Sequence, residues 1–320
     1  MKFIKLTTLL FCTFLSFCLP VHAFRFVVCG DSRSATIDPP FNTEVLTYIN
    51  SQITGLQPVP DFLFFLGDSV RRAQVTVPVV HSYLHDWHDF MTSTLNGIPL
   101  YMVLGNSDIY GDTGWTEASA QAAYQLEFNT MPDNGPSDLY KYMTYSFEYG
   151  EGNSRTLFVV LDSYLVSGAT HNDNNIDSTQ IAWFKQQTAA SSANHKMVLS
   201  HAPFFSTEGW PVGNGVRQIW DNATSYELFF CSHEHIYSRW SLYPATATKG
   251  LQILSGTNGA PIDPNDSSHY VNSNAHPYYG YNFVVVDVEG NNILLRAYGV
   301  TDNGDGSFTT RLIDTARVAK

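Results

Sequence analysis

The sequence predicts an α/β fold, and three of its features support this prediction. Short, continuous apolar runs alternate with stretches of helical periodicity over most of the chain, which is typical of a sheet covered on both faces by helices. Hydrophobic residues make up 44% of the 320 residues, which is enough for a full core and excludes a disordered chain. The absence of a Gly-X-Y period, a heptad run or a long repeat excludes collagen, coiled coils and repeat arrays.

The first third of the chain alternates between strand and helix patterns. Val45, Leu46 and Ile49 have the spacing of one face of a helix, whereas the apolar runs on either side are unbroken. The expected strands cover residues 24–29, 62–66 and 100–104, and the expected helices cover residues 43–53 and 79–93. Each of these strands ends at a glycine followed by a polar residue, which marks a turn.

The alternation resumes after a polar stretch, rich in Gly and Asp, at residues 110–137. The expected strands there cover residues 140–149, 156–161, 197–199 and 228–231, with a helix at residues 178–187. Beyond residue 240 no helical pattern remains. Residues 251–254, 283–288 and 293–298 predict a run of antiparallel strands, with a hairpin turn at residues 290–292. Because no linker or composition break is visible, we expect residues 24–320 to form one domain.

Residues 1–23 have the organisation of a secretory signal peptide. Two lysines precede an apolar run at residues 6–19, and Val21 and Ala23 provide small residues at the −3 and −1 positions. The run is too short to span a bilayer comfortably, and the chain has no other run of this kind. We expect cleavage after Ala23 and a secreted protein, periplasmic or extracellular, without a transmembrane anchor. An uncleaved anchor is the alternative.

Charge and cysteine content narrow the choice of partners. The 29 acidic and 17 basic residues give a formal net charge of −12, which argues against electrostatic binding of nucleic acid or an anionic membrane. Cys29 and Cys231 are the two cysteines outside the signal peptide. They lack the spacing of a structural zinc site, and we expect buried free thiols, although export leaves a disulfide possible.

Polar side chains follow five of the expected strands, at the point where each strand ends. The carboxyl ends of strands are where sites assemble in α/β sheets, because rigid strands hold the adjoining loops in place. Carboxylate, amide and imidazole groups together suit Mn, Fe or Zn. The candidate metal ligands are Asp31, Asp68, Asn106, His201, His233 and His235.

The order of these motifs resembles that of the calcineurin-like metallophosphoesterases, a superfamily that includes purple acid phosphatases and acid sphingomyelinase-like enzymes. The motifs are Gly30-Asp31-x-Arg33, Gly67-Asp68, Gly105-Asn106-Ser107-Asp108, His201-Ala202-Pro203 and Ser232-His233-Glu234-His235. The resemblance implies a four-layer α/β/β/α sandwich of two mixed β-sheets flanked by helices. It also implies a metal-dependent phosphatase or phosphodiesterase that hydrolyses small-molecule phosphoric esters.

The resemblance further implies a role for each motif residue. Asp68 would bridge two ions, Asp31 and His235 would hold the first with it, and Asn106, His201 and His233 would hold the second. A hydroxide between the ions would attack phosphorus in line. The expected cofactors are one or two divalent or trivalent ions, with Mn, Fe or Zn favoured. The candidate catalytic residues are Arg33, Asn106, Ser107 and Asp108.

Arg33 departs from the pattern of the superfamily. A histidine that binds the first metal usually stands at this position, and purple phosphatases use a tyrosine where this chain has Arg71. An arginine has no lone pair for a metal, so the first site lacks a ligand, and a fixed positive charge weakens the site further unless Arg33 points away. A guanidinium grips phosphate well. We expect Arg33 to bind substrate and the first ion to be weak or exchangeable.

Ser107 is the second departure, since the superfamily has a histidine there that positions phosphate and protonates the leaving group. Serine cannot donate a proton near neutral pH, and a general acid contributes ~10² to 10⁴ in rate. Poor leaving groups should therefore turn over slowly. By residue type, His171, His269 or His276 could replace this acid, and ordinary loop histidines are the alternative.

Further features leave alternatives open. His81, His85 and His88 share one helical face, which suits either metal binding or a solvated surface. Asp162 either orients the site or caps a turn, and the tyrosines of residues 270–281 either line a substrate wall or pack on strands. For the function, the alternatives are a catalytically weakened or inactive ligand-binding protein with this fold, or a hydrolase of another bond.

Overall fold

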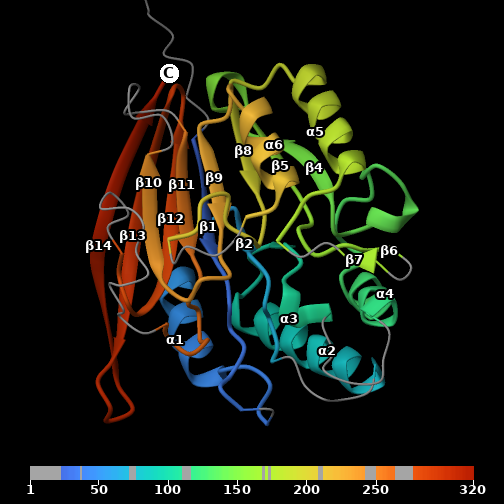
Figure 1. Cartoon of the computed structure of the whole chain (residues 1–320). Helices are drawn as coiled ribbons and strands as arrows, with labels where there is room; N and C mark the ends of the chain where they lie inside the picture. The colour runs from blue at the N-terminus through green and yellow to red at the C-terminus, as the bar shows by residue number, and fades with distance from the viewer. Residues whose placement is uncertain are drawn as a thin grey trace, which may run out of the picture.

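The computed structural model describes residues 23–36, 38–71, 77–109, 117–167, 170–171, 174–207, 212–241, 250–263 and 277–320. Two six-stranded mixed sheets pack face to face, and helices cover their outer faces (Figure 1). The four-layer sandwich that the resemblance implied is therefore confirmed. No helix within the described ranges is long and apolar enough to span a membrane. The expected signal peptide lies outside the described residues, apart from Ala23.

The first sheet has the strand order β14-β13-β12-β1-β2-β3. Strands β1 (Phe24–Cys29), β2 (Phe62–Phe65) and β3 (Leu100–Met102) are parallel. Strands β12 (Tyr281–Glu289), β13 (Asn292–Asp302) and β14 (Phe308–Ala319) continue the sheet antiparallel from β1. The hairpin between β12 and β13 turns at Gly290, whose φ of +56° suits glycine, as the sequence predicted.

The second sheet has the strand order β10-β11-β9-β8-β5-β4. Its strands are β4 (Tyr145–Tyr149), β5 (Thr156–Val160), β8 (His195–Leu199), β9 (Leu228–Cys231), β10 (Tyr237–Ser241) and β11 (Leu251–Ser255). The four central strands are parallel, and β4 and β10 are antiparallel at the edges. Strands β6 (Val166–Ser167) and β7 (Thr170–His171) form a separate small sheet.

One prediction about strand pairing was wrong. Residues 251–254 do not join residues 283–288 and 293–298 in an antiparallel run, because β11 lies in the second sheet, parallel to β9. An apolar run specifies a buried strand but not its neighbour or direction, since both depend on how the chain returns to the sheet. Similarly, residues 140–149 form a strand only from Tyr145 onward, because a 3₁₀ turn covers Asp138–Tyr140.

Helices pack on the outer face of each sheet. On the first sheet lie α1 (Thr43–Thr54) and α2 (Val77–Thr94). Helix α4 (Glu117–Glu127) packs on α2, and the short α3 (Asn106–Ile109) packs on α4. On the second sheet lie α5 (Ser178–Ala190) and α6 (Asn214–Asn222) (Figure 1). The helices expected at residues 43–53, 79–93 and 178–187 are confirmed as α1, α2 and α5. Helix α4 lies in the stretch that the sequence analysis described as polar.

The alternation of side chains along β2 shows how the layers hold together. Phe64 faces the second sheet, where its ring centroid lies 5.3 Å from that of Phe158 on β5. Phe65 faces the opposite way and stacks edge-on against Trp87 of α2 at 4.6 Å. Aromatic pairs of this kind stabilise by ~0.5–1.5 kcal/mol beyond the burial of their area. This packing brings the carboxyl ends of β1, β2, β8 and β9 to one region between the sheets.

Cys29 and Cys231 lie at the last positions of β1 and β9, and both are buried free thiols, as expected. Burial raises the pKa of Cys29 to about 12, so its reactive thiolate does not form near neutral pH. Both cysteines therefore act as small apolar residues beneath the strand ends.

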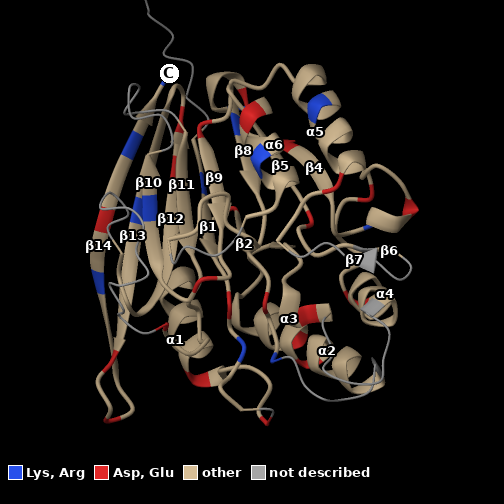
Figure 2. Cartoon of the chain, in the orientation of Figure 1, with Lys and Arg blue, Asp and Glu red and all other residues tan. Residues whose placement is uncertain are grey.

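Basic and acidic residues are both spread over strands and helices (Figure 2). On the outer strands, Arg239 of β10 pairs with Asp314 of β14, with Nε 2.6 Å from Oδ2. Arg25 of β1 pairs with Asp287 of β12 at the same distance. Arg239 thus pairs with a strand of the opposite sheet, and Arg25 shares Asp287 with Arg296 of β13.

Candidate metal centre

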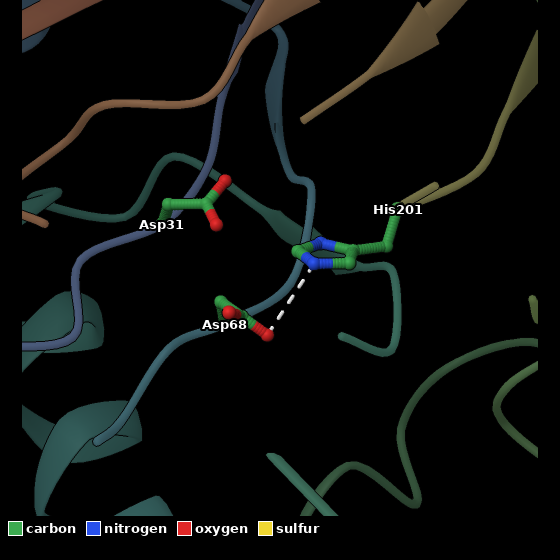
Figure 3. Close-up of side chains that lie close together, drawn as sticks. All are labelled: Asp31, Asp68 and His201. Atoms are coloured by element: carbon green, nitrogen blue, oxygen red, sulfur yellow. Dashed lines mark ion pairs between the residues drawn. The ribbon is translucent and has the colours of Figure 1, made fainter. Parts of the chain in front are cut away.

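Side chains from both sheets converge where the central strands end. Asp31 follows β1, Asp68 follows β2 and His201 follows β8, and all three are buried. One potential ligand atom from each of them lies within 4.8 Å of the others. Figure 3 shows the two carboxylates and the imidazole turned toward a common space. The strand-end residues that the sequence singled out are therefore brought together rather than dispersed.

Strained turns aim these side chains. Asp31, Asp68 and His233 have φ values of 59°, 54° and 73°, a left-handed conformation that non-glycine residues rarely adopt. Each such residue costs ~1–3 kcal/mol and persists only where its surroundings hold it. The amide of Asp31 donates to the carbonyl of Gly67 at 2.9 Å, which joins the ends of β1 and β2.

Gly67 and Gly105 allow two loops to touch directly. A Cβ on Gly105 would lie 2.2 Å from the amide nitrogen of Asp68 and 2.4 Å from its Oδ1. A Cβ on Gly67 would lie 2.5 Å from the nitrogen of Gly105. Because real Cβ atoms do not approach other atoms so closely, both positions need glycine for the carboxylate of Asp68 to enter the centre.

Asp108 holds the same loops from behind. Its Oδ2 accepts hydrogen bonds from the amides of Gly105 at 2.9 Å and Asp68 at 3.1 Å, and its Oδ1 accepts from the amide of Ser69 at 2.9 Å. These contacts make Asp108 a positioning residue for Asp68. The catalytic role that the sequence suggested for Asp108 stays a prediction.

Around the expected second-metal site, acceptor atoms face one another. The Nδ1–H of His201 donates to the carbonyl of Leu66 at 2.6 Å, which leaves the lone pair on Nε2. That Nε2 lies 3.1 Å from Oδ1 of Asn106 and 3.4 Å from Oδ1 of Asp68. A carboxylate oxygen, an amide oxygen and an imidazole nitrogen that face one another are the kinds of ligand atom that suit Mn, Fe or Zn.

His233 completes this group. Its Nδ1 lies 2.9 Å from Oδ1 of Asn106 and 3.3 Å from Nε2 of His201. Burial, with His201 nearby, lowers the pKa of His233 to about 3, so its imidazole stays neutral at physiological pH. A neutral imidazole is the form that binds metal. The assignment of Asp68, Asn106, His201 and His233 to one ion stays a prediction, and the group whose ligand atoms converge within 4.8 Å is Asp31, Asp68 and His201.

The expected first-metal site differs from the second because an arginine side chain lies within it. Its acceptors are Oδ1 of Asp31 and Nε2 of His235, 3.5 Å apart, because the Nδ1–H of His235 donates to the carbonyl of Pro261 at 2.7 Å. Oδ1 of Asp31 accepts no hydrogen bond from the residues that the structure describes. The guanidinium of Arg33 lies beside them, with Nη2 3.4 Å from Nε2 of His235 and Nε 3.4 Å from Oδ2 of Asp68. Arg33 points into this site, not away from it.

Ser107 and Arg71 occupy clear positions. The amide of Ser107 donates to Oδ1 of Asp68 and its hydroxyl donates to Oδ2, both at 2.7 Å. Ser107 thus orients the carboxylate that the resemblance identifies as a metal bridge. Arg71 donates from Nη1 to the backbone carbonyl of Ser34 at 3.1 Å and so belongs to the neighbouring loop.

The sequence analysis missed Tyr164. Its ring centroid lies 5.6 Å from that of His201 and 5.9 Å from that of His233, and its hydroxyl is 3.3 Å from Nδ1 of His233. Asp162, at the end of β5, accepts from the amide of Tyr164 at 2.8 Å. Asp162 therefore caps a turn and, through Tyr164, also helps to position the histidines. Tyr164 could have been identified only from the pairing of β5 with β8, which brings the end of β5 close to His201. This pairing is a feature of the tertiary structure and is not visible in the sequence.

The three histidines of α2 gather around one carboxylate. His81, His85 and His88 each have a ring nitrogen between 2.7 and 3.5 Å from an oxygen of Glu127, at the end of α4. The cluster joins α2 to α4.

As for the proposed replacements of the general acid, His269 and His276 lie outside the described residues, as does the side chain of His171. Residues 270–276 of the tyrosine-rich segment lie outside them too.

Comparison with known proteins adds the family. Residues 24–237 match the family described as Calcineurin-like phosphoesterase. Tartrate-resistant acid phosphatase type 5 from Sus scrofa is 24% identical over 233 residues, which cover 68% of this chain and 65% of that protein. The same protein from Oryctolagus cuniculus is 25% identical over 227 residues, covering 66% of each chain. The chain thus spans just under two thirds of the length of these relatives.

Solved structures share the fold. PhoD superposes with a TM-score of 0.69 at 11% identity, over 94% of this chain and 70% of that one. Purple acid phosphatase PPD1 from yellow lupin (Lupinus luteus) gives a TM-score of 0.60 at 15% identity, over 93% of this chain and 54% of that one. At such low identity these likenesses concern the fold alone.

Proposed function

Because this chain belongs to the calcineurin-like phosphoesterase family, we propose that it is a secreted, metal-dependent hydrolase of small-molecule phosphoric esters. The observation that carries the proposal is the convergence of buried potential ligand atoms of Asp31, Asp68 and His201 within 4.8 Å of one another, with Oδ1 of Asn106 3.1 Å from Nε2 of His201. Acid phosphatases among the relatives support a hydrolase.

The residues fit one ion, held by Asp68, Asn106, His201 and His233. When bound, such an ion supplies Lewis acidity toward the phosphoryl group and makes water a nucleophile near neutral pH. The chain's own contribution is to hold the ligands rigidly: Leu66 orients His201 through its carbonyl, and Ser107 orients Asp68. Fixed ligands keep the geometry that in-line displacement needs.

Arg33 is the residue that we assign to the phosphate. A guanidinium carries five N–H donors, more than its contacts with Asp68 and His235 use. Its side chain is 27% exposed, so it borders the solvent from which an ester would enter. Arg33 can therefore contact the buried carboxylate of Asp68 and still donate free N–H groups to the oxygens of a phosphoryl group.

The test is turnover of aryl phosphate monoesters and diesters by the purified protein with Mn, Fe, Zn or Ca. We expect hydrolysis with at least one metal, and a loss of at least ~100-fold in His201→Ala, because even outer-shell changes at metal sites cost ~10–100-fold. His85→Ala, an exposed histidine of α2, is the control and should retain activity. Failure to turn over either substrate class with any metal would contradict the proposal.

A second candidate is a ligand-binding protein that kept the fold and lost activity. The position of Arg33 in the expected first-metal site favours it, because one ion fewer leaves less charge to stabilise the transition state. Tight binding of a phosphoric ester, measured by calorimetry, without turnover under any metal would select this candidate.

Secretion rests on residues 1–23 and is tested separately. Expression of the full chain in a secreting host should yield a mature protein outside the cytoplasm whose first residue is Phe24. Mass spectrometry of the intact protein distinguishes this product from an uncleaved chain.

A further inference from the structure

We propose that Arg33 permanently replaces the first metal ion, so that the centre binds one ion beside a built-in guanidinium. This inference rests on the proposed function, because it assumes that Asp68, Asn106, His201 and His233 hold an ion. It goes further by assigning the other half of the centre to a side chain.

The first argument is the position of the guanidinium. Its Nε is 3.4 Å from Oδ2 of Asp68 and its Nη2 is 3.4 Å from Nε2 of His235. These two atoms, with Oδ1 of Asp31, are the acceptors that the first ion would need. Metal bonds to such atoms are ~2.0–2.2 Å long, so an ion bound to Asp68 and His235 would need the space that the guanidinium nitrogens border.

The second argument is charge. Asp31 and Asp68 are 0% and 2% exposed, and two buried carboxylates need compensating positive charge. Arg33 provides one such charge beside Asp68, because a guanidinium is a fixed cation. The same fixed charge repels a second cation at this short range, where little water screens it.

The third argument is that the backbone of Arg33 is anchored. The amides of Ser32 and Arg33 both donate to the carbonyl of Asp68, at 3.0 and 3.2 Å, and Arg33 forms an isolated β-bridge with Phe41. The hydroxyl of Ser32 donates to the carbonyl of Ser69 and accepts from the indole of Trp87, both at 2.8 Å. The guanidinium therefore starts from a fixed point next to the carboxylate that it faces.

The carboxylate of Asp68 then serves two different cations. Its Oδ1 faces Nε2 of His201 on the side of the remaining ion, and its Oδ2 faces Arg33. Asp68 would thus link an ion to a guanidinium instead of bridging two ions.

The experiment measures metal content by mass spectrometry and by calorimetric titration of the whole mature protein with Mn²⁺ or Zn²⁺. We expect one ion in the wild type and two in Arg33→His, in which an imidazole supplies the missing lone pair and the fixed charge is gone. Arg217→His is the matched control, because Arg217 is exposed on α6, on the outer face of the second sheet, and this variant should hold one ion.

A spectroscopic readout supplements the count. With Mn²⁺, the wild type should show the electron paramagnetic resonance spectrum of an isolated ion, and Arg33→His should show that of a spin-coupled pair. If circular dichroism shows that the variant does not fold, the wild-type spectrum and stoichiometry still distinguish one bound ion from two.

The outcomes separate this inference from the proposed function. Two tightly held ions in the active wild type would overturn the role of Arg33 and leave the hydrolase intact. A folded Arg33→His variant that still holds one ion would overturn it as well. One ion without turnover would support the inference and contradict the hydrolase, and no ion would contradict both.

Discussion

Replacement of Gly105 by alanine should both destabilise the protein and weaken its ion site. The added Cβ would lie 2.2 Å from the amide nitrogen of Asp68 and 2.4 Å from its Oδ1, so backbone or carboxylate has to move. Overpacking typically costs ~1–3 kcal/mol, and contacts with backbone place this case at the upper end, ~3 kcal/mol. In a protein of this size, that corresponds to a decrease in melting temperature of roughly 5 °C.

Comparison of Gly105→Ala with Gly97→Ala separates the steric cost of an added Cβ from the cost of an unfavourable φ angle. A Cβ at Gly97 meets nothing within 4 Å, but its φ of +86° is unfavourable for alanine, whereas no such φ applies at Gly105. We expect ~1 kcal/mol for Gly97→Ala and unchanged affinity for Zn²⁺. Calorimetry should therefore show the larger loss of stability, together with weakened Zn²⁺ binding, in Gly105→Ala alone. A Gly105→Ala protein that melts within about 2 °C of the wild type and binds Zn²⁺ equally well would refute the steric reasoning.

Three other predictions concern single side chains. Burial raises the pKa of Asp162 to about 7, so this carboxyl favours the folded state below pH 4 and loses that contribution as the pH rises to about 7. Each unit of pKa shift corresponds to ~1.36 kcal/mol, so the Asp162 carboxyl lowers the free energy of unfolding by about 4 kcal/mol between these pH values. In Asp162→Asn this decrease should be absent. Glu127 raises the pKa of His85, so Glu127→Gln should lower the melting temperature more at pH 5.5 than at pH 8.5. Because the hydroxyl of Ser107 is bound to Asp68, kcat should depend steeply on leaving-group pKa, and Ser107→His should raise alkyl phosphate turnover by ~10².

Each has its contradicting result. A denaturation series of Asp162→Asn with the same pH slope as the wild type would remove that carboxyl from the explanation. Equal melting shifts of Glu127→Gln at both pH values would show that the histidine cluster does not stabilise through protonation. Equal wild-type kcat values for aryl and alkyl phosphates would mean that another group protonates the leaving oxygen.

Much of the local structure was predictable because it depends on short segments. The unbroken apolar runs at residues 24–29 and 228–231 became β1 and β9 with the same bounds, and the apolar spacing at residues 43–53 became α1. Helix α4 was missed because residues 110–137 are polar as a whole. Its stability depends on burying Tyr124 and on contact with α2, which a local pattern does not show.

The candidate site was predictable as a set of residues but not as an arrangement. A glycine followed by Asp or Asn at the end of an apolar run identifies a polar residue at a strand end, whatever the neighbouring strand is. The roles of Asp108 and Tyr164 were not visible, because each acts through residues that come close only in the folded chain. Asp108 binds the amide of Asp68, 40 positions earlier.

By itself, the sequence determined which side chains end the strands, that these are carboxylates, an amide and imidazoles, and that an arginine stands at position 33. Only the tertiary structure decided where that arginine points. Its partner His235 lies 202 positions further along the chain, between β9 and β10 of the other sheet, so their contact exists only when the two sheets are packed. The direction of a long, charged side chain is set by the charges around it, and those charges come together through folding.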